Sequence, residues 1–194
     1  MRCLKLFLGF SLIITSNCYC QKGYDHLFNL KTGPNSIGYL VENHIDNSRT
    51  FNRKWDYYGN RNLQNNRQIQ MHIWYPAQIT ESDTLVTYKK YIVESAVNTT
   101  GGTPNIEDIE ETLSRYREQL LSSDIDSNLV ENFLETRTKA YWDTQFVQEK
   151  FPLIICAPSI NSNPYENIVL IEYLVSYGYV VVSSPSIGNG SLEL

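Results

Sequence analysis

The sequence has few cysteines and histidines, and most of them lie near its start. Three of the 4 cysteines fall within residues 1–20, so Cys156 alone remains in the rest of the chain and no internal disulfide can form there. The 3 histidines, His26, His44 and His72, show no spacing typical of metal ligands, and no glycine-rich phosphate-binding loop occurs. We therefore expect no metal ion and no cofactor, and a fold that depends on its hydrophobic core.

Positive charge is also scarce. The 16 basic residues are outnumbered by 21 acidic ones, and the net charge of -5 argues against nucleic acid as the main partner. The apolar run at the N-terminus, Leu6 to Ile14, is too short to cross a membrane. The content of 42% hydrophobic and 12% aromatic residues, with 14 tyrosines, indicates a sizeable globular core and excludes a disordered chain.

Residues 1–20 are typical of a secretory signal peptide. A positively charged start precedes the apolar run, and small and polar residues follow it. We expect cleavage after Cys20, which would make the mature protein secreted or periplasmic, without a transmembrane segment. A lipoprotein anchor at Cys18 or Cys20 is the less favoured alternative, because the residues before these cysteines do not have a Leu-Ala-Gly-type pattern.

Two strands are expected in the first half of the chain. A short apolar stretch from Ile37 to Val41 favours the first. Residues 67–75 alternate between two faces, as a half-buried strand does. One face carries Ile69, Met71, Ile73 and Tyr75, which we expect to be buried, and the other carries Gln70, His72 and Trp74. His72 is therefore expected to be an ordinary surface residue.

A helical segment is expected at about 104–150. Apolar residues at three- and four-residue spacing from Ile106 to Leu120 predict one helix, and Ser127 is expected to cap a second that extends to Tyr141. The segment from Asn105 to Lys150 carries 11 acidic and 5 basic residues. A solvated helix surface is the favoured interpretation, and a cap over a binding cleft is the alternative.

The C-terminal part of the chain predicts a strand–helix–strand unit. Leu153 to Ala157 and Tyr179 to Val182 are continuous apolar runs, typical of strands covered on both faces. Between them, Asn163-Pro164 is expected to begin a helix and Gly178 to end it. Such a unit has parallel strands and a right-handed crossover, which indicates the α/β class.

Three stretches, in this order and spacing, resemble the secreted α/β-hydrolases related to platelet-activating factor acetylhydrolase and dienelactone hydrolase. They are Gln68 to Ala77, with the ending Trp-Tyr-Pro-Ala, then Phe151 to Ser159, and Glu172 to Val182. Asp46 to Arg49 resembles a family stretch more weakly. The resemblance extends from about Gly33 to the C-terminus, and the helices between Asn105 and Lys150 resemble a family-variable insertion.

The resemblance implies an incomplete α/β-hydrolase fold, with a mostly parallel sheet, flanking helices and a helical insertion. Residues 21–194 would form the N-terminal portion of one such domain. In this family the loop after the strand ending near Ala157 supplies a backbone N–H to the oxyanion hole. The matching donors are Ile160 first and Ser159 second. The family usually has His-Gly where this chain has Pro158-Ser159.

The nucleophile and the catalytic histidine expected of such an enzyme have no match in the chain. The motif Gly-x-Ser-x-Gly does not occur, and Ser186 is rejected as nucleophile because the first glycine is missing and it follows the wrong strand. No catalytic residue is therefore assigned. One interpretation is the N-terminal fragment of a secreted carboxylic-ester hydrolase acting on a short-chain ester or a phospholipid acyl ester. The alternative is a non-catalytic secreted module that binds a partner through its acidic helical segment.

Overall fold

The structure is a computed structural model of the chain, and it describes residues 30–50, 66–96, 106–123, 125–159 and 162–185. Three features expected from the sequence lie outside these ranges: the signal peptide, the oxyanion donor Ile160 and the rejected nucleophile Ser186. Ser159 and the strand–helix–strand unit lie within them.

The described strands form one mixed sheet in the order β3-β4-β1-β2-β7-β6, with β5 paired to β2. The strands are β1 (Ser36–Thr50), β2 (Asn66–Gln78), β3 (Leu85–Thr87), β4 (Arg137–Trp142), β5 (Gln145–Phe146), β6 (Leu153–Cys156) and β7 (Val180–Ser183). Pairs β6–β7 and β4–β1 are parallel, and the other described pairs are antiparallel. With its flanking helices, this sheet confirms the α/β class.

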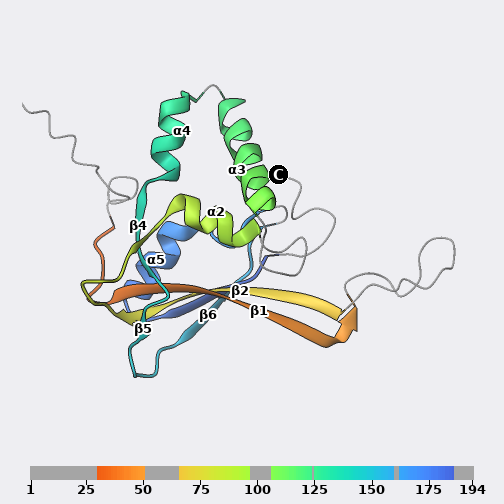
Figure 1. Cartoon of the computed structure of the whole chain (residues 1–194). Helices are drawn as coiled ribbons and strands as arrows, with labels where there is room; N and C mark the ends of the chain where they lie inside the picture. The colour runs from red at the N-terminus through yellow and green to blue at the C-terminus, as the bar shows by residue number, and fades with distance from the viewer. Residues whose placement is uncertain (1–29, 51–65, 97–105, 124, 160–161, 186–194) are drawn as a thin grey trace, which may run out of the picture.

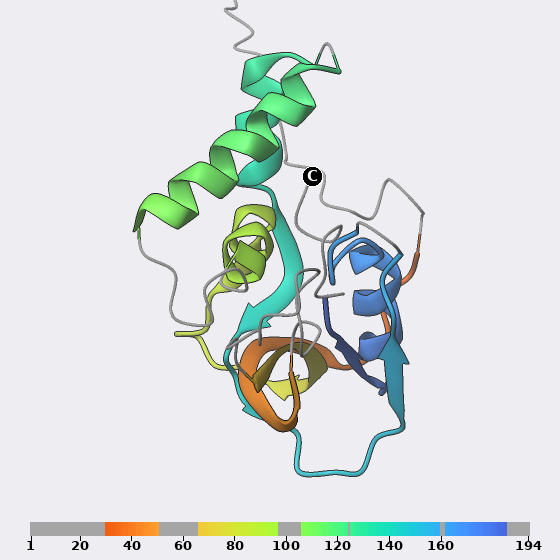
Figure 2. The same ribbon diagram turned by 90° about the vertical axis from the view of Figure 1, so that its right-hand side faces the viewer.

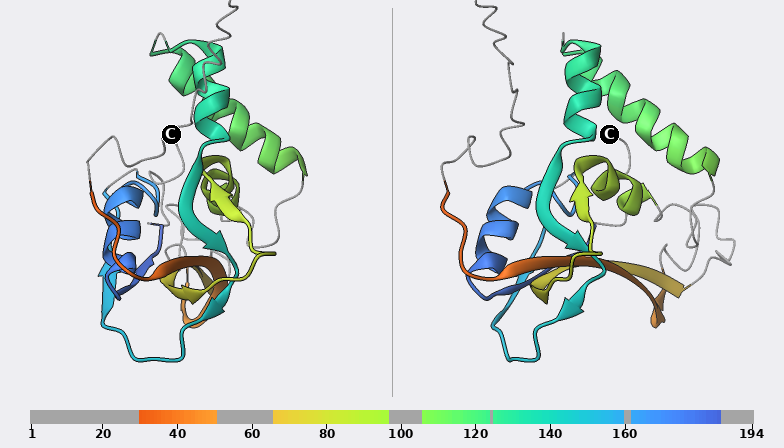
Figure 3. Two further views of the ribbon diagram at one scale, coloured as in Figure 1. Left: turned by 90° about the vertical axis from the view of Figure 1, so that its left-hand side faces the viewer. Right: turned by 60° about the vertical axis from the view of Figure 1, so that its left-hand side comes forward.

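The described helices lie on one side of the β1–β2 ribbon (Figure 1). They are α2 (Tyr88–Ala96), α3 (Ile106–Leu121), α4 (Ser127–Leu134) and α5 (Ile168–Ser176). Helices α2 and α5 pack on the sheet, where Tyr91 and Ile171 join Tyr39 and Trp74 in one core. Helices α3 and α4 stand away from the sheet as a pair (Figures 2 and 3).

The alternation expected in β2 is present, but the expected direction of its faces is wrong. Gln70, His72 and Trp74 are fully buried, so His72 is not the surface residue that was expected. On the other face Ile69, Met71 and Ile73 are half-buried, and Tyr75 is buried as expected. The reason is that α2 and α5 cover the face that carries Gln70, His72 and Trp74. The polar atoms of these side chains form hydrogen bonds there. Trp74, for example, donates its indole N–H to the Tyr91 hydroxyl over 3.1 Å.

The helical segment is shorter than expected, because its second helix ends at Leu134. The following residues form β4, in which Thr138 and Ala140 are buried between exposed or half-buried neighbours. Threonine and aromatic residues favour a pleated strand at such positions. The cap of α4 also differs: the Asp126 side chain, not that of Ser127, accepts the first-turn N–H of Asn128 at 2.8 Å.

Strands β6 and β7 are parallel, as the sequence predicted, but only one face of β6 is covered. Leu153 is 59% exposed and Ile155 is 78% exposed, while Ile154 and Cys156 pack against the core. Helix α5 begins at Ile168, later than the expected start at Asn163-Pro164, because residues 164–167 form turns. Gly178 follows the end of α5, as predicted, with a φ of 91°.

Candidate functional site

The carboxyl ends of β6 and β7 lie side by side, and the candidate site follows them. Cys156 pairs with Ser183 in the parallel register, so the loops that leave both strands begin at the same edge of the sheet. Cys156 is half-buried and packs against the core. The Ser183 hydroxyl is buried and has no hydrogen-bond partner among the described residues. In open α/β sheets, ligands bind beyond this end of the strands.

The loop after β6 is tied to the start of α5 by one carboxylate. Oε1 of Glu166 accepts hydrogen bonds from the Ser159 backbone N–H at 2.8 Å, the Ser159 hydroxyl at 3.2 Å and the Asn167 side-chain amide at 3.3 Å. The Ser159 carbonyl accepts the N–H of Ser162 at 3.1 Å. Ser159 is thus held through both its N–H and its carbonyl.

The described hydrogen-bond donors to Glu166 are neutral groups. Hydrogen bonds from the Ser162 side chain, then from the backbone and hydroxyl of Ser159, hold the pKa of the Glu166 carboxyl below its usual value. The carboxylate is therefore ionised at neutral pH and remains an acceptor. A loop that satisfies a carboxylate with an N–H and hydroxyl groups has the donors that stabilise negative charge on oxygen.

A buried tyrosine fixes the chain next to this carboxylate. Tyr165 is 2% exposed, and its ring stacks on Tyr91 with centroids 5.9 Å apart and meets Tyr88 edge-on at 5.7 Å. Both partners belong to α2. Since Tyr165 precedes Glu166 directly and Ile168, also buried, begins α5, the backbone of Glu166 is fixed on both sides. Helix α2 is thereby packed against the candidate site.

A mainly apolar hollow of about 340 Å³ lies along the first turn of α5. Its lining residues are Leu30, Glu166, Asn167, Ile168, Val169 and Leu170. Leu170 is 53% exposed. The Glu166 carboxylate therefore lies at the border of an apolar surface, an arrangement suited to a ligand with one polar and one apolar part.

A second buried carboxyl group lies in the middle of α5. Glu172 is 2% exposed and accepts hydrogen bonds from the Tyr91 hydroxyl and from the backbone N–H of Lys139, both at 3.2 Å. Burial raises the pKa of Glu172 to about 7. This group joins α5 to α2 and to β4 from inside the core, away from the strand ends.

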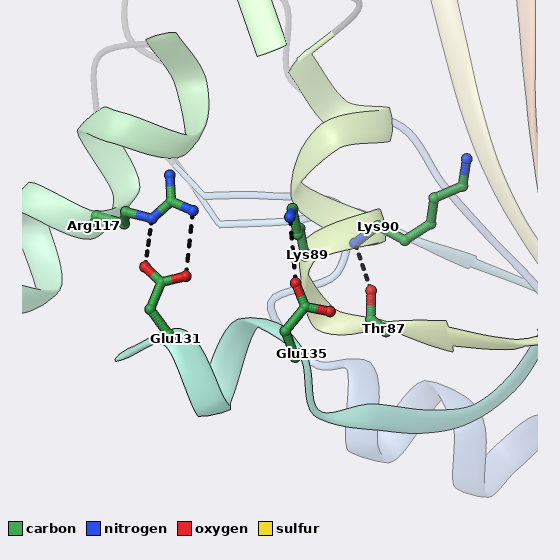
Figure 4. A network of polar contacts seen from close by, with 6 residues as sticks. All are labelled: Thr87, Lys89, Lys90, Arg117, Glu131 and Glu135. Carbon is green, nitrogen blue, oxygen red and sulfur yellow. Dashed lines mark hydrogen bonds and ion pairs between the residues drawn. The ribbon is translucent and has the colours of Figure 1, made fainter. Parts of the chain in front are cut away.

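Exposed ion pairs connect the acidic helices α3 and α4 with each other and with α2 (Figure 4). The guanidinium of Arg117 on α3 meets Glu131 on α4 with two hydrogen bonds, of 2.6 Å and 3.3 Å. Lys89 on α2 pairs with Glu135 at 3.3 Å. These contacts are exposed and connect the three helices, so they agree with the interpretation of this segment as a solvated surface.

Of the two oxyanion donors expected from the sequence, the structure describes Ser159, and its N–H is already bound to Glu166. Sequence reasoning missed Glu166, because a glutamate seven residues after a serine belongs to no motif. The only signal was its place between Pro164 and the apolar face of α5. His44, an exposed residue, pairs with Glu42 at 2.9 Å and joins no site.

Within the described ranges, no group of three or more His, Cys, Asp or Glu side chains is placed to hold a metal ion. None of the helices in these ranges is long and apolar enough to span a bilayer.

Comparison with known proteins finds similarity among solved structures. No family model matches the sequence, and no curated protein matches it. Among solved structures, a ferulic acid esterase from Streptomyces cinnamoneus is similar with a TM-score of 0.47 and 17% sequence identity over 80% of this chain. The matched part is 36% of that enzyme, so the chain spans about a third of its length.

Proposed function

We propose that this chain is the N-terminal part of a secreted carboxylic-ester hydrolase with a serine nucleophile. A short-chain ester or a phospholipid acyl ester is the proposed substrate class, as the resemblance of three sequence stretches implies. The observation that carries the proposal is that β6 is the last strand of the described sheet and exposes an apolar face. Strand β6 pairs in parallel with β7 and exposes Leu153 and Ile155. Exposed apolar side chains on a parallel strand at the end of a sheet are typical of a sheet that continues.

The position of β6 as the last strand of the described sheet supports a site at the end of β6. The crossover from β6 to β7 runs toward β2, and β7 is flanked by β2 and β6. A further parallel strand that extends this unit would therefore join the other side of β6. The direction of winding then reverses at β6. Ligands of open α/β sheets bind at such a switch point, beyond the carboxyl ends of the strands. The loop with Ser159 occupies this position.

The face of the sheet opposite the helices supports the same conclusion. Cross-strand neighbours Leu40, Ile73, Val182 and Ile155 form an apolar row on this face. Because crossovers are right-handed, a connection that runs back from β7 past β6 places its helix on the face opposite α5. That helix would cover the row, as a buried parallel sheet requires.

The proposed chemistry uses the loop after β6 together with a serine, a histidine and an aspartate from the rest of the proposed enzyme. The proposed enzyme attacks the ester carbonyl with a serine hydroxyl, and a histidine oriented by an aspartate takes the proton. In the proposed enzyme, the loop after β6 donates a backbone N–H to the oxyanion. Since Glu166 already engages the N–H of Ser159, we assign this donation to Ile160.

We propose in addition that residues 1–20 direct export and are removed. The charged start and the apolar run support this assignment. Mass spectrometry of the exported protein should find Gln21, or a residue close to it, at the N-terminus. A mature protein that still begins with Met1 would contradict it.

The reading frame around this sequence in genomic DNA tests the proposal. We expect the frame to continue past Leu194 and to encode Gly-x-Ser-x-Gly, followed by an acidic residue and a histidine. A stop codon directly after Leu194, together with a stable fold of residues 21–194, would contradict the proposal and favour the non-catalytic binding module.

A further inference from the structure

We propose that Glu172 is a pH-sensitive latch: its protonated carboxyl group holds helix α2 on helix α5, and its ionisation opens that contact. The inference does not rest on the proposed function, since it concerns the described core alone. One oxygen of Glu172 accepts the Tyr91 hydroxyl of α2, and the other accepts the backbone N–H of Lys139 in β4, both at 3.2 Å. A single buried side chain of α5 therefore joins two other elements.

The contacts of Glu172 suit a neutral acid better than a carboxylate. Both hydrogen bonds are longer than the roughly 2.5–2.9 Å that donors to a charged oxygen adopt. The side chain is 2% exposed, so an ionised group would be shielded from the water that normally stabilises it. Lys139 supplies positive charge, but its ammonium also donates to the Thr32 hydroxyl at 3.4 Å. The closed contact thus favours the proton-bearing form of Glu172, in agreement with the pKa that burial raises.

The tyrosines and the histidine around Glu172 stay neutral while Glu172 titrates. Burial raises the pKa of Tyr91 on α2 and that of Tyr39 on β1, and the ring centroids of these two residues are 4.5 Å apart. On β2, His72 is neutral, because burial lowers its pKa to about 3. Lys139 on β4 is the described residue whose charge acts on Glu172. A pH effect on this contact near neutrality therefore originates in Glu172.

Opening at Glu172 reaches the candidate site through Tyr91. The Tyr91 hydroxyl also accepts the indole N–H of Trp74 at 3.1 Å, and its ring stacks on Tyr165, which precedes Glu166. Helix α2 has nine residues, and a helix of this length depends on tertiary packing for its stability. An ionised Glu172 gains hydration when α2 moves away, so local opening of α2 becomes more frequent as the pH rises. Acidic pH thus keeps Tyr165 packed at the start of α5, and alkaline pH loosens it.

Hydrogen–deuterium exchange of the 194-residue chain at pH 5 and pH 8, read by mass spectrometry, tests the latch. Protection factors correct for the intrinsic pH dependence of exchange. We expect the protection of α2 to fall by about 10- to 100-fold over this interval, because each pH unit between the open and closed pKa values changes the opening constant by up to about tenfold. Strand β2 around Trp74 should remain more protected than α2, since α2 opens without the rest of the chain.

Two variants assign the effect. Glu172→Gln is neutral at every pH, so the protection of its α2 should be the same at pH 5 and pH 8. Glu149→Gln removes an exposed carboxylate elsewhere and should behave like the wild type. Circular dichroism checks that each variant is folded before the protection factors are compared.

Three exchange results overturn the inference. They are α2 protection in the wild type that does not change between pH 5 and pH 8, an equal fall in Glu172→Gln, and α2 protection as high as that of β2, which would mean that α2 opens only in global unfolding. Carbon-13 NMR of the glutamate carboxyl groups in the wild type needs no folded variant. It should show one carboxyl that titrates near pH 7, and titration of all of them below pH 5 would also overturn the inference.

Discussion

The hydroxyl of Tyr39 donates a hydrogen bond to Nδ1 of His72 over 2.7 Å in the fully buried core. The direction of this bond follows from the other ring nitrogen. Gln70 donates its amide to the Glu94 carbonyl, so its Oε1 accepts, and the Nε2–H of His72 donates to it over 2.9 Å. His72 is therefore neutral with its proton on Nε2, and burial lowers its pKa to about 3.

The first prediction concerns the pH dependence that His72 gives to stability. The folded pKa of about 3 lies below the unfolded value of 6.5, so the unfolded chain binds the proton first as pH falls. The contribution of His72 to the free energy of unfolding is complete above pH 6.5. It decreases as the pH falls toward 3, by up to about 1.4 kcal/mol per pH unit. In His72→Gln this slope should be absent, as urea unfolding between pH 4 and 7 can measure. An unchanged slope relative to the wild type would contradict a neutral buried His72.

Glu172 is predicted to act in the opposite direction. Its folded pKa of about 7 lies above the unfolded value of 4.5, so the folded chain holds the proton more tightly. Its contribution is complete below pH 4.5 and is lost as pH rises to about 7. Relative to the wild type, Glu172→Gln should become more stable as pH rises across this window. The same unfolding series checks this, and a Glu172→Gln difference that does not vary with pH would refute it.

The sequence predicted the elements that have strong local signals. The parallel β6–β7 unit follows from two apolar runs around a helix, and the end of that helix follows from Gly178, which adopts a positive φ. The alternation of β2 was predicted, but not which face is buried, because that depends on α2, a helix of nine residues that the sequence analysis did not predict. The candidate site depends on Glu166. Its hydrogen bond with Ser159 forms only in the folded chain, so the sequence alone did not indicate it.

Two serines with different partners give the third prediction. The Ser183 hydroxyl is buried without a partner among the described residues, whereas that of Ser176 accepts the N–H of Gly33 at 2.9 Å and donates to the Tyr173 carbonyl at 2.6 Å. Ser183→Ala should leave the free energy of unfolding unchanged or raise it by up to about 1 kcal/mol. Ser176→Ala should lower it by about 1–3 kcal/mol. Urea unfolding measures both, and a larger loss for Ser183→Ala would show that its hydroxyl has a partner.

Neighbouring isoleucines on opposite faces of β6 give the fourth prediction. In the 194-residue chain, Ile155→Ser should change the free energy of unfolding by no more than about 0.5 kcal/mol, since Ile155 is 78% exposed. Ile154→Ser, the matched control, removes a core contact and should lower it by about 1–3 kcal/mol. In the polypeptide from the complete reading frame, Ile155→Ser should lower the free energy of unfolding by about as much as Ile154→Ser does, about 1–3 kcal/mol. A neutral effect in both proteins would contradict a covering layer on this face.

Hydrolysis of p-nitrophenyl acetate by two purified proteins tests the proposed enzyme most directly. One protein is residues 21–194, and the other is the polypeptide encoded by the complete reading frame. We predict that residues 21–194 give no turnover, and that the longer polypeptide gives turnover that is abolished by Ser→Ala within its Gly-x-Ser-x-Gly motif. Absence of turnover by the longer polypeptide, or turnover by residues 21–194 that a single Ser→Ala change abolishes, would contradict the proposal.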